Sequence, residues 1–552
     1  MPEKLTLALA QLNPTLGDIS GNLNKLRTIR KQAAAQGANL LMTSELYICG
    51  YPPEDLILKP SFQNAIHKAV EALARETSDG GPAILLGTPW REEDKLYNAM
   101  LLLSEGRIAG KTYKRELPNY GPFDEKRVFT SWQMPEPISF RGLRLGVMIC
   151  EDMWIPTVTR ILKDRGAQML LVPNGSPFEI GKMDSRRMLA EARIKESGLP
   201  LVYVHQVGGQ DELVFDGASF VLDAEGKCAV QAASWDEDFI LTHWTIGSEG
   251  CRPEAGVMKP IPQGESAIYN ALVLGLRDYV NKNGFPGVIL GLSGGIDSAL
   301  VAAVAVDALG ADRVWAVMMP SPYTSTESLE DAETVARNLK CRFETIPITT
   351  VMAAFSQTLA TPFVGRVADT TEENLQSRCR GMILMALSNK FGPMVLSTGN
   401  KSEMSVGYTT LYGDLCGGFA VLKDLYKTQV YKVAKWRNKN KLVSVLGPEG
   451  IIIPENILTK APTAELKPDQ KDQDNLPPYE VLDDILECLI EKDMGIQEIV
   501  GRNHDIATIK RVWSMLDKAE YKRRQAPPGV KITRRNLGKD RRYPITNKYR
   551  ES

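Results

Sequence analysis

Short apolar segments and helix-like stretches alternate along the N-terminal part of the chain. Up to about residue 245, the strand-like apolar segments are LTLALAQL, ANLLMTSEL, PAILLGTPW, NAMLLLSEG, LRLGVMICED and QMLLVPNGS. Alternation of this kind predicts an α/β domain. The opening MPEKLTLALAQLNP alternates apolar and polar residues as a strand does, and it lacks the basic and long apolar regions of a secretory signal.

A segment rich in proline and glycine interrupts this pattern. Between His243 and Gly264 the chain reads TIGSEGCRPEAGVMKPIPQG, which has weak periodicity and suits a linker. The stretch AIYNALVLGLRDYVNKNG then predicts a helix, and GVILGLSGGIDSALVAAVAVDALG predicts a strand, a glycine turn and a long apolar helix. We therefore predict an α/β domain over 1–245, a linker over 246–265 and a second α/β domain over 266–552.

The C-terminal region carries two charged segments. The segment KPDQKDQDNLPPYE contains proline, which predicts an exposed loop, and helices are expected from Tyr479 to Ala519. The tail YKRRQAPPGVKITRRNLGKDRRYP is strongly basic. It is either a solvated tail or a lid that closes over an anionic substrate, and the sequence leaves both interpretations open.

Composition narrows the class of protein. The 552 residues are 43% apolar and 24% charged, as in a soluble globular protein, and 66 basic residues nearly balance 67 acidic ones. Any phosphate group must therefore be bound by particular residues rather than by an overall positive charge. With so little net charge, we do not expect nucleic acid as a partner. We do not expect a membrane either, since apolar runs stay below the ~18 residues of a membrane span. Eight cysteines without paired CxxC spacing and only four histidines predict a cytoplasmic enzyme without a disulfide framework, a structural zinc or histidine-based catalysis.

Three residues with reactive side chains end predicted strands of the N-terminal domain. They are Glu45 in LLMTSEL, Lys114 in KTYKRELPNYG and Cys150 in LGVMICEDMW. A cysteine attacks a carboxamide as a thiolate, so a nearby ammonium that lowers its pKa and a carboxylate that accepts its proton both favour the reaction. Glu45 suits the base, and Lys114 suits stabilisation of the oxyanion. Taken singly, each residue is also an ordinary buried cysteine or solvated charge.

The order and context of these residues resemble the nitrilase (carbon–nitrogen hydrolase) superfamily over roughly residues 4–240. The resemblance includes the turn PNGSPF and the segment VYVHQVGGQDELVFDGASF. It implies an αββα sandwich with Glu45 as base, Lys114 as oxyanion stabiliser and Cys150 as nucleophile.

Four further residues lie beside these motifs. Tyr120, Ser176 and Lys182 match the glutamine-contacting positions of the glutamine-dependent relatives. Glu125, in PFDEKRVF, is either a fourth charged group near the site or a solvated charge in a polar loop.

The string GLSGGIDS lies between an apolar strand and an apolar helix in the second domain. Its glycines allow the backbone to approach a phosphate, and the helix N-terminus attracts an anion. The loop lacks the GK[ST] ending of a Walker A motif. It resembles the SGGxDS loop of the ATP pyrophosphatase family, which cleaves ATP to AMP and pyrophosphate. That resemblance implies a doubly wound parallel sheet, a magnesium ligand at Asp297, and an ATP-binding loop made of Gly291, Leu292, Ser293, Gly294, Gly295, Ile296, Asp297 and Ser298.

Four other strings resemble the NAD synthetases within that family: EENLQSRCRGMILMALSN, VLSTGNKSEMSVGYTTLYGD, LKDLYKT and KAPTAEL. The resemblance assigns ATP contacts to Thr398, Lys427 and Thr463. It assigns contacts with deamido-NAD to Asn374, Arg378, Glu403 and Lys522, with Glu403 also a magnesium ligand.

The chain departs from the ammonia-using synthetases at two positions. Those enzymes carry a lysine and a second aspartate where this chain has Leu411 and Gly418. We therefore expect the pyridine ring to be contacted from elsewhere, by backbone or side chains between Tyr408 and Asp414.

Together the two resemblances imply a glutamine-using NAD synthetase. Cys150 would release ammonia from glutamine, and ATP with Mg²⁺ would activate deamido-NAD, which ammonia converts to NAD in the last step of NAD biosynthesis. A shielded passage for ammonia and a homo-oligomer, either a dimer or an octamer, are hypotheses from the same resemblance. Two alternatives stay open: an amidotransferase acting on GMP or an amino-acid carboxylate, and a regulatory protein whose inactive nitrilase domain only senses nucleotides.

Overall fold

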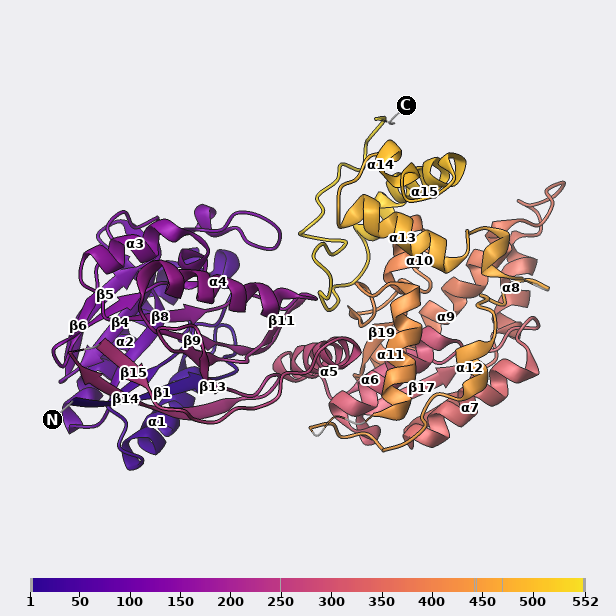
Figure 1. The fold of residues 1–552 in the computed structure, drawn as a ribbon. Coiled ribbons are helices and arrows are strands. Elements are labelled where there is room, and N and C mark those ends of the chain that lie inside the picture. Colours follow the sequence, from indigo (N-terminus) through magenta and orange to yellow (C-terminus); the bar gives the residue numbers. More distant parts are fainter. Residues whose placement is uncertain (1–2, 249, 441, 443, 469, 550–552) are drawn as a thin grey trace. The chain divides into compact units, whose positions relative to one another are not determined.

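The chain folds into two compact units, Met1–Pro262 and Gln263–Ser552, each described by itself (Figure 1). The structure is a computed structural model that describes residues 3–248, 250–440, 442, 444–468 and 470–549.

Two sheets form the centre of the first unit. Within the described residues, the larger sheet has the order β15-β14-β1-β2-β3-β4-β5, with bounds Gly250–Pro253, Asp238–Gly247, Glu3–Gln11, Leu40–Met42, Ala83–Glu92, Lys95–Ser104 and Arg107–Tyr113. The second sheet has the order β13-β12-β9-β8-β7-β6, with bounds Cys228–Gln231, Phe220–Leu222, Leu201–His205, Met169–Asn174, Leu143–Val147 and Ile138–Phe140. A separate hairpin joins β10 (Val207–Gln210) and β11 (Leu213–Asp216). Four α-helices complete the unit in the described residues: α1 Ile19–Ala35, α2 Pro60–Glu76, α3 Pro156–Asp164 and α4 Lys182–Ser197.

Alternation along the strands produces the layers of this unit. On β1, Leu7 and Leu9 pack in the core shared by the two sheets, whereas Ala8 and Ala10 pack in the core that includes α1 and α2. Successive side chains of a strand point to opposite faces, so each sheet buries one face against the other sheet and one against helices. Helices α3 and α4 cover the second sheet in the same way. The predicted αββα sandwich is confirmed.

Part of the predicted linker belongs to the first sheet. Strand β15 pairs with β14, and Cys251 within it is 3% exposed. Farther along, the Lys259 N–H donates to the Gln231 carbonyl at 3.0 Å. The structure thus differs from the irregular connection expected over 246–265, because β15 satisfies hydrogen-bonding groups that β14 would otherwise leave unpaired at the sheet edge.

The second unit has a parallel sheet of order β18-β17-β16-β19-β20 in the described part of the chain. The strand bounds are Arg342–Thr345, Val314–Met318, Val288–Gly291, Met394–Ser397 and Phe419–Ala420. The strand order reverses between β16 and β19, and such a reversal opens a crevice at the carboxyl ends of the strands. The predicted doubly wound sheet is confirmed.

Twelve α-helices surround this sheet in the described residues. They are α5 Glu265–Lys282, α6 Ile296–Leu309, α7 Thr326–Leu339, α8 Thr349–Leu359, α9 Thr370–Phe391, α10 Lys401–Val406, α11 Lys427–Lys439, α12 Glu455–Thr459, α13 Tyr479–Ile490, α14 Ile496–Val500, α15 Ile506–Lys518 and α16 Glu520–Arg523. Short 3₁₀ turns occur along the whole chain at Glu54–Leu58, Thr77–Asp79, Glu125–Arg127, Cys150–Trp154, Ala311–Arg313 and Asp472–Asp474. Among the described residues, no helix has both the length and the apolar content needed to span a membrane.

Both charged C-terminal segments differ from expectation. In the loop expected to be exposed, Gln470 and Asp472 are buried. The Asp472 carboxylate accepts a hydrogen bond from the Tyr479 hydroxyl at 2.8 Å, which compensates its burial. In the basic tail, Lys531 is 2% exposed and donates to Asp540 at 2.7 Å. The part of the basic tail around Lys531 is therefore packed into the second unit, and the interpretation of that part as a solvated tail is wrong.

Helix α6 carries the predicted phosphate loop at its start and is buried almost all round. A helix that is apolar on every side belongs in a core. Its one buried acid, Asp307, accepts from the Arg437 guanidinium at 2.5 and 3.0 Å and from the Tyr269 hydroxyl at 2.5 Å. These bonds join α5, α6 and α11.

We predict that Arg437→Met lowers the free energy of unfolding by about 3–5 kcal/mol, because it leaves the buried Asp307 carboxylate without its charged partner. Chemical denaturation of the variant measures the loss. The control is Arg337→Met, which breaks an exposed pair with Glu333 and should cost about 0.5 kcal/mol or less. Equal stability of the two variants would contradict the structural role of Arg437.

Candidate active sites

Glu45, Lys114 and Cys150 meet at one end of the sandwich. They follow β2, β5 and β7 respectively, and each is at most 2% exposed. The Lys114 ammonium donates to Glu45 Oε1 at 2.7 Å. The Cys150 thiol lies close enough for the charges of both residues to act on its pKa. The structure thus brings together three residues that lie far apart in the sequence.

Glu125 belongs to the same cluster. It is 5% exposed, and its Oε1 accepts from the Lys114 ammonium at 2.8 Å and from the Tyr51 hydroxyl at 2.9 Å. The interpretation of Glu125 as a solvated loop charge is therefore wrong. Burial raises the pKa of Glu125 to about 7, although Lys114 opposes the shift.

The lysine stays charged in this setting. Burial alone would lower the pKa of Lys114, but Glu125 and Glu45 raise it well above its usual value. Glu45 is held from a second side, because Asn98 Nδ2 donates to its Oε1 at 2.7 Å. Its other oxygen, Oε2, is buried and has no hydrogen-bond partner in the part of the chain that the structure describes.

Cys150, the predicted nucleophile, differs from the expectation that its pKa is lowered. Burial raises the pKa of Cys150 well above its usual value, Glu45 adds to the effect, and Lys114 opposes it only in part. The side chain is therefore a neutral thiol in this structure. Its backbone has a φ of 47°, a left-handed conformation that is rare outside glycine and common where strain serves a reactive group.

Asp152 fixes the turn that carries Cys150. Its Oδ2 accepts from the Ile149 N–H at 3.0 Å, and its Oδ1 accepts from the N–H groups of Arg115 and Glu116 at 3.1 and 2.8 Å. The buried carboxylate thus joins the backbone beside Cys150 to the backbone that follows Lys114. Sequence reasoning missed this residue, although its place two positions after the cysteine in CEDMW was a local signal.

Two of the three predicted glutamine contacts, Tyr120 and Lys182, lie near Glu151. The Tyr120 hydroxyl donates to its carboxylate at 3.0 and 3.1 Å, and burial raises the pKa of Glu151. Lys182 begins α4, where its Nζ lies 4.7 Å from the Trp154 ring centroid and acts on the pKa of Glu151. Ser176 is 3% exposed in the turn after β8.

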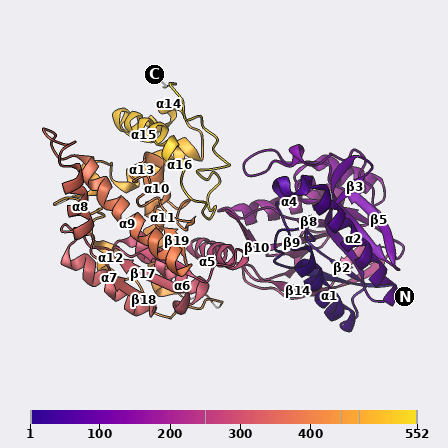
Figure 2. The same ribbon diagram turned by 180° about the vertical axis from the view of Figure 1, so that it is seen from behind.

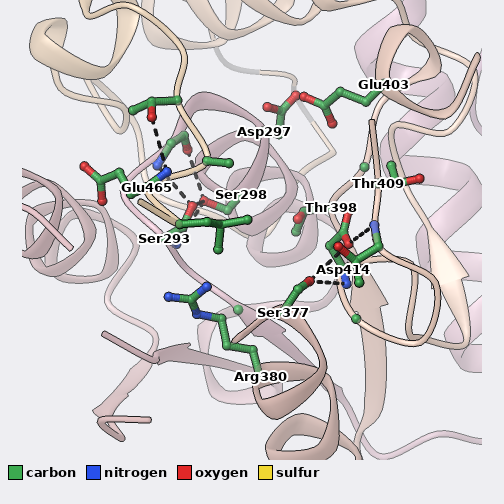
Figure 3. Close-up of a pocket in the computed structure, with 18 of the residues that line it drawn as sticks. Ser293, Asp297, Ser298, Ser377, Arg380, Thr398, Glu403, Thr409, Asp414 and Glu465 are labelled. Carbon is green, nitrogen blue, oxygen red and sulfur yellow. Dashed lines mark hydrogen bonds between the residues drawn. The ribbon is translucent and has the colours of Figure 1, made fainter. Parts of the chain in front are cut away.

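The second unit contains a cavity of about 590 Å³ at the carboxyl ends of β16 and β19 (Figure 3). Most of the predicted ATP and dinucleotide residues line it: Gly291, Leu292, Ser293, Gly295, Ile296, Asp297, Ser298, Asn374, Thr398, Glu403, Lys427, Thr463 and Lys522. Gly294 and Arg378 are not among the lining residues. The Arg378 Nε instead donates to the Leu411 carbonyl at 3.2 Å.

The loop over 291–298 has the geometry of an anion cradle. Gly294 has a φ of 78°, and a Cβ there would lie 2.3 Å from the Ser328 carbonyl oxygen, so only glycine fits. The hydroxyls of Ser293 and Ser298 are 3.1 Å apart. The loop ends at the N-terminus of α6, whose unpaired N–H groups favour a phosphate.

Two carboxylates face one another across this cavity. Figure 3 shows Asp297 and Glu403 pointing toward each other, and the Lys427 ammonium lies 2.5 Å from Asp297 Oδ2 and 3.1 Å from Glu403 Oε1. Burial raises the pKa of Glu403 to about 7. Burial opposes the charge of Lys427, but Asp297 and Glu403 raise its pKa above the usual value. Asn400 Nδ2 donates to Asp297 Oδ1 at 2.9 Å and orients it.

This donor set fits magnesium bound together with a nucleotide. Within the described ranges, no cluster of three or more His, Cys, Asp or Glu side chains could hold a metal ion. Magnesium is commonly held by one or two carboxylates while phosphate oxygens and waters complete its shell. Asp297 and Glu403 provide such a pair.

The segment from Tyr408 to Asp414 lines the cavity through Tyr408, Thr409, Thr410, Gly413 and Asp414, whereas neither Leu411 nor Gly418 is a lining residue. Lys522 reaches this segment from α16 and donates to the carbonyls of Gly407 and Thr409 at 2.9 and 2.6 Å.

Several lining residues were missed by sequence reasoning: Ser328, Ser377, Arg380, Glu465, Gln470 and Asp472. Arg380 lies two positions after Arg378 on α9, and its Nε donates to the Met319 carbonyl at 2.9 Å. The helical segment ENLQSRCRG was a signal for both arginines, but it did not show which one faces the cavity.

Comparison with known proteins assigns the chain to a family. The carbon-nitrogen hydrolase family matches residues 6–248, and the NAD synthase family matches residues 268–526. A glutamine-dependent NAD(+) synthetase of Rhodobacter capsulatus is 46% identical over 551 residues, and one of Thermotoga maritima is 45% identical over 581 residues, with 100% of both chains covered in each case. The chain belongs to the glutamine-dependent NAD(+) synthetases.

A solved structure agrees with this membership. The glutamine-dependent NAD+ synthetase from Acinetobacter baumannii, in complex with adenosine diphosphate, is 43% identical and has a TM-score of 0.79, with 99% of each chain covered. For this member of the glutamine-dependent NAD(+) synthetases, the alternative of an amidotransferase acting on GMP or an amino-acid carboxylate is wrong. The regulatory alternative is wrong as well, because the family is one of ligases.

We predict that Asp152→Asn lowers glutamine-supported turnover about 100-fold, the loss typical of a reacting group displaced by about 1 Å. The amide would set an N–H donor among backbone N–H groups and leave a buried donor unpaired. Steady-state rates with glutamine and with an ammonium salt measure the effect, and the ammonia-supported rate should not change. Asp164→Asn, an exposed position on α3, is the control. Equal losses with both nitrogen donors would contradict the assignment.

Proposed function

We propose that this enzyme hydrolyses L-glutamine to glutamate and ammonia in its first unit and uses ATP in its second unit to convert deamido-NAD to NAD, with release of AMP and pyrophosphate. The observation that carries the proposal is the presence, in one chain, of a buried Glu–Lys–Cys cluster and a glycine-loop cavity with paired carboxylates. We assign the first activity to residues 1–245 and the second to residues 266–552.

In the glutaminase reaction, Cys150 Sγ attacks the carboxamide carbon of glutamine while Glu45 takes the thiol proton. The raised pKa of Cys150 supports this role, because the thiol needs a base at the moment of attack. Lys114 stabilises the oxyanion that forms. Glu45 returns the proton to the departing nitrogen, ammonia leaves, and Glu45 then activates the water that cleaves the thioester to release glutamate.

Tyr120, Ser176 and Lys182 are proposed to bind the amino-acid end of glutamine. The acidic Glu151 and the basic Lys182 near Tyr120 support this, since a free amino acid carries one positive and one negative group.

In the synthetase reaction, the nicotinate carboxylate of deamido-NAD attacks the α-phosphorus of ATP and pyrophosphate leaves. The loop over 291–298 is proposed to hold the pyrophosphate, and Thr398, Lys427 and Thr463 to hold the rest of the nucleotide. Asp297 and Glu403 would hold Mg²⁺, which neutralises phosphate charge when bound. The position of Lys427 between these carboxylates supports a role as a donor to phosphate oxygens.

Ammonia completes the amide. Its nitrogen attacks the carbonyl carbon of the adenylylated nicotinate, the bond to AMP breaks, and the nitrogen loses a proton. Asn374, Arg378, Glu403 and Lys522 are proposed to contact the dinucleotide. Asn374 and Lys522 line the cavity, which supports direct contact with the dinucleotide. Arg378 contacts the 408–414 segment, which supports an indirect role through that segment.

We further propose that the enzyme is a cytoplasmic homo-oligomer, either a dimer or an octamer. All eight cysteines lie within the described residues and carry free thiols, which suits a reducing compartment. Figures 1 and 2 show α8 and α9 side by side in the second unit, and apolar side chains are exposed on and near them at Val364, Val367, Met382 and Phe391. A surface of this kind favours association with another protein chain.

We predict that Cys150→Ala abolishes NAD formation with glutamine and leaves NAD formation with an ammonium salt largely intact, because ammonia bypasses the first site. An assay with deamido-NAD, ATP and magnesium measures both rates. Cys228→Ala, at a partly exposed thiol on β13, should behave as the wild type. Loss of both activities in the folded Cys150 variant would refute the scheme of two sites.

We predict that Asp297→Ala lowers NAD formation at least about 100-fold with either nitrogen donor, since it removes a charged group from the centre of the proposed phosphate chemistry. Glutamate release from glutamine in the same preparation shows that the protein is folded. Asp312→Ala, at an exposed position in the same unit, is the control. Full activity of the Asp297 variant would exclude the assigned role.

A further inference from the structure

A buried polar chain of Arg186, Asp216 and His205 lies in the first unit and has no part in the scheme above. Arg186 is on α4, Asp216 ends β11 and His205 ends β9. They are 1%, 4% and 0% exposed respectively. Burial of ionised groups costs several kcal/mol unless they are well paired, and well-packed apolar residues often stabilise a fold equally well. Stability alone therefore does not explain why these three polar residues are buried here.

Both cationic arms of Arg186 are engaged. Its Nη1 donates to Asp216 Oδ1 and Oδ2 at 2.7 and 2.9 Å. Its Nη2 donates to the carbonyls of Ser176 and Pro177 at 2.7 and 3.2 Å. The guanidinium thus ties a buried carboxylate to the backbone of the turn that follows β8.

His205 holds the start of the same turn. Its Nδ1 lies 3.1 Å from the Asn174 carbonyl oxygen, and its Nε2 lies 3.3 Å from Asp216 Oδ1. The turn over 174–177 is consequently held at one end by Arg186, which is hydrogen-bonded to Asp216, and contacted at the other by His205, whose Nε2 lies near Asp216 without a hydrogen bond.

This turn forms a wall of the glutaminase site. A Cβ at Gly175 would lie only 2.9 Å from Glu45 Oε2, so the backbone passes directly against the proposed base. Ser176, a proposed glutamine contact, donates its N–H to Asn174 Oδ1 at 2.8 Å. Glu45 is independently held by Lys114 and Asn98. A looser turn would therefore move Ser176 more than the base.

We propose that Arg186, supported by Asp216 and His205, is a positioning residue that fixes the 174–177 turn as a wall of the glutamine pocket and thereby sets the affinity for glutamine. The inference rests on the proposed glutaminase function of this unit. It assigns Arg186 to substrate binding rather than to the reactivity of Cys150, and it gives the segment VYVHQVGGQDELVFDGASF a role through His205 and Asp216.

The test is Arg186→Met in the full-length enzyme, with three measurements. The KM for glutamine should rise about tenfold or more, the loss expected when charge-assisted hydrogen bonds to the turn disappear. The kcat with glutamine should fall far less, as it does when uniform binding is lost. The rate at which iodoacetamide alkylates Cys150 and the ammonia-supported rate of NAD formation should match the wild type.

Two further variants separate positioning from folding. Asp216→Asn should raise the KM in the same direction while preserving side-chain volume. Arg186→Lys keeps the charge but loses the forked contact with two carbonyls, so its KM should lie between those of the wild type and Arg186→Met. Arg187→Met is the matched control, since the neighbouring Arg187 donates to Gln231 and lies over the Phe220 ring, away from the turn. If Arg186→Met does not fold, Asp216→Asn and Arg186→Lys decide the matter.

An unchanged KM for glutamine in the folded variants would overturn the proposal. A fall in kcat and in the alkylation rate at unchanged KM would overturn it too, because these residues would then act on the thiol. Failure of the wild-type enzyme to release glutamate from glutamine would instead refute the proposed function of the unit.

Discussion

A buried ammonium between two carboxylates is the interaction on which each site depends. Lys114 lies between Glu45 and Glu125 in the first unit, and Lys427 lies between Asp297 and Glu403 in the second. In each cluster, burial alone would lower the pKa of the lysine and favour its neutral form, whereas the two acids raise its pKa and keep it charged. The acids in turn need the lysine, since two carboxylates close together in a low-dielectric interior repel one another strongly.

The two clusters use this balance for different chemistry. In the first unit, burial and the net negative charge that the cluster carries when both acids are ionised keep the neighbouring cysteine protonated, so its attack on a carboxamide needs a base. In the second unit the paired acids and the lysine face a glycine loop at a helix N-terminus, a setting that attracts phosphate. In the first unit Glu45 and Lys114 follow β2 and β5, whereas in the second Asp297, Glu403 and Lys427 lie in the first turns of α6, α10 and α11. Strand ends and helix starts thus determine where the charges meet.

The sequence predicted more of the fold and the local motifs than of the contacts between them. Strand-ending Glu45, Lys114 and Cys150 and the loop over 291–298 were visible because each combines a reactive residue with an apolar strand before it. Asp472 was not visible and Glu125 stayed open between the site and a solvated loop, since a charge in a polar segment looks solvated until the fold brings a partner to it. The pKa of Cys150 was predicted in the wrong direction, because the sequence shows the lysine but not the burial or the distances that outweigh it.

Burial of Cys150 also bears on how the enzyme withstands oxidants. Peroxides oxidise thiolates that are exposed to solvent, and the resulting sulfinic and sulfonic acids are irreversible. A cysteine that is 2% exposed and retains its proton reacts poorly with such agents. The resting thiol is therefore expected to react slowly with oxidants, and Glu45, the proposed base, would make it reactive towards glutamine by taking its proton.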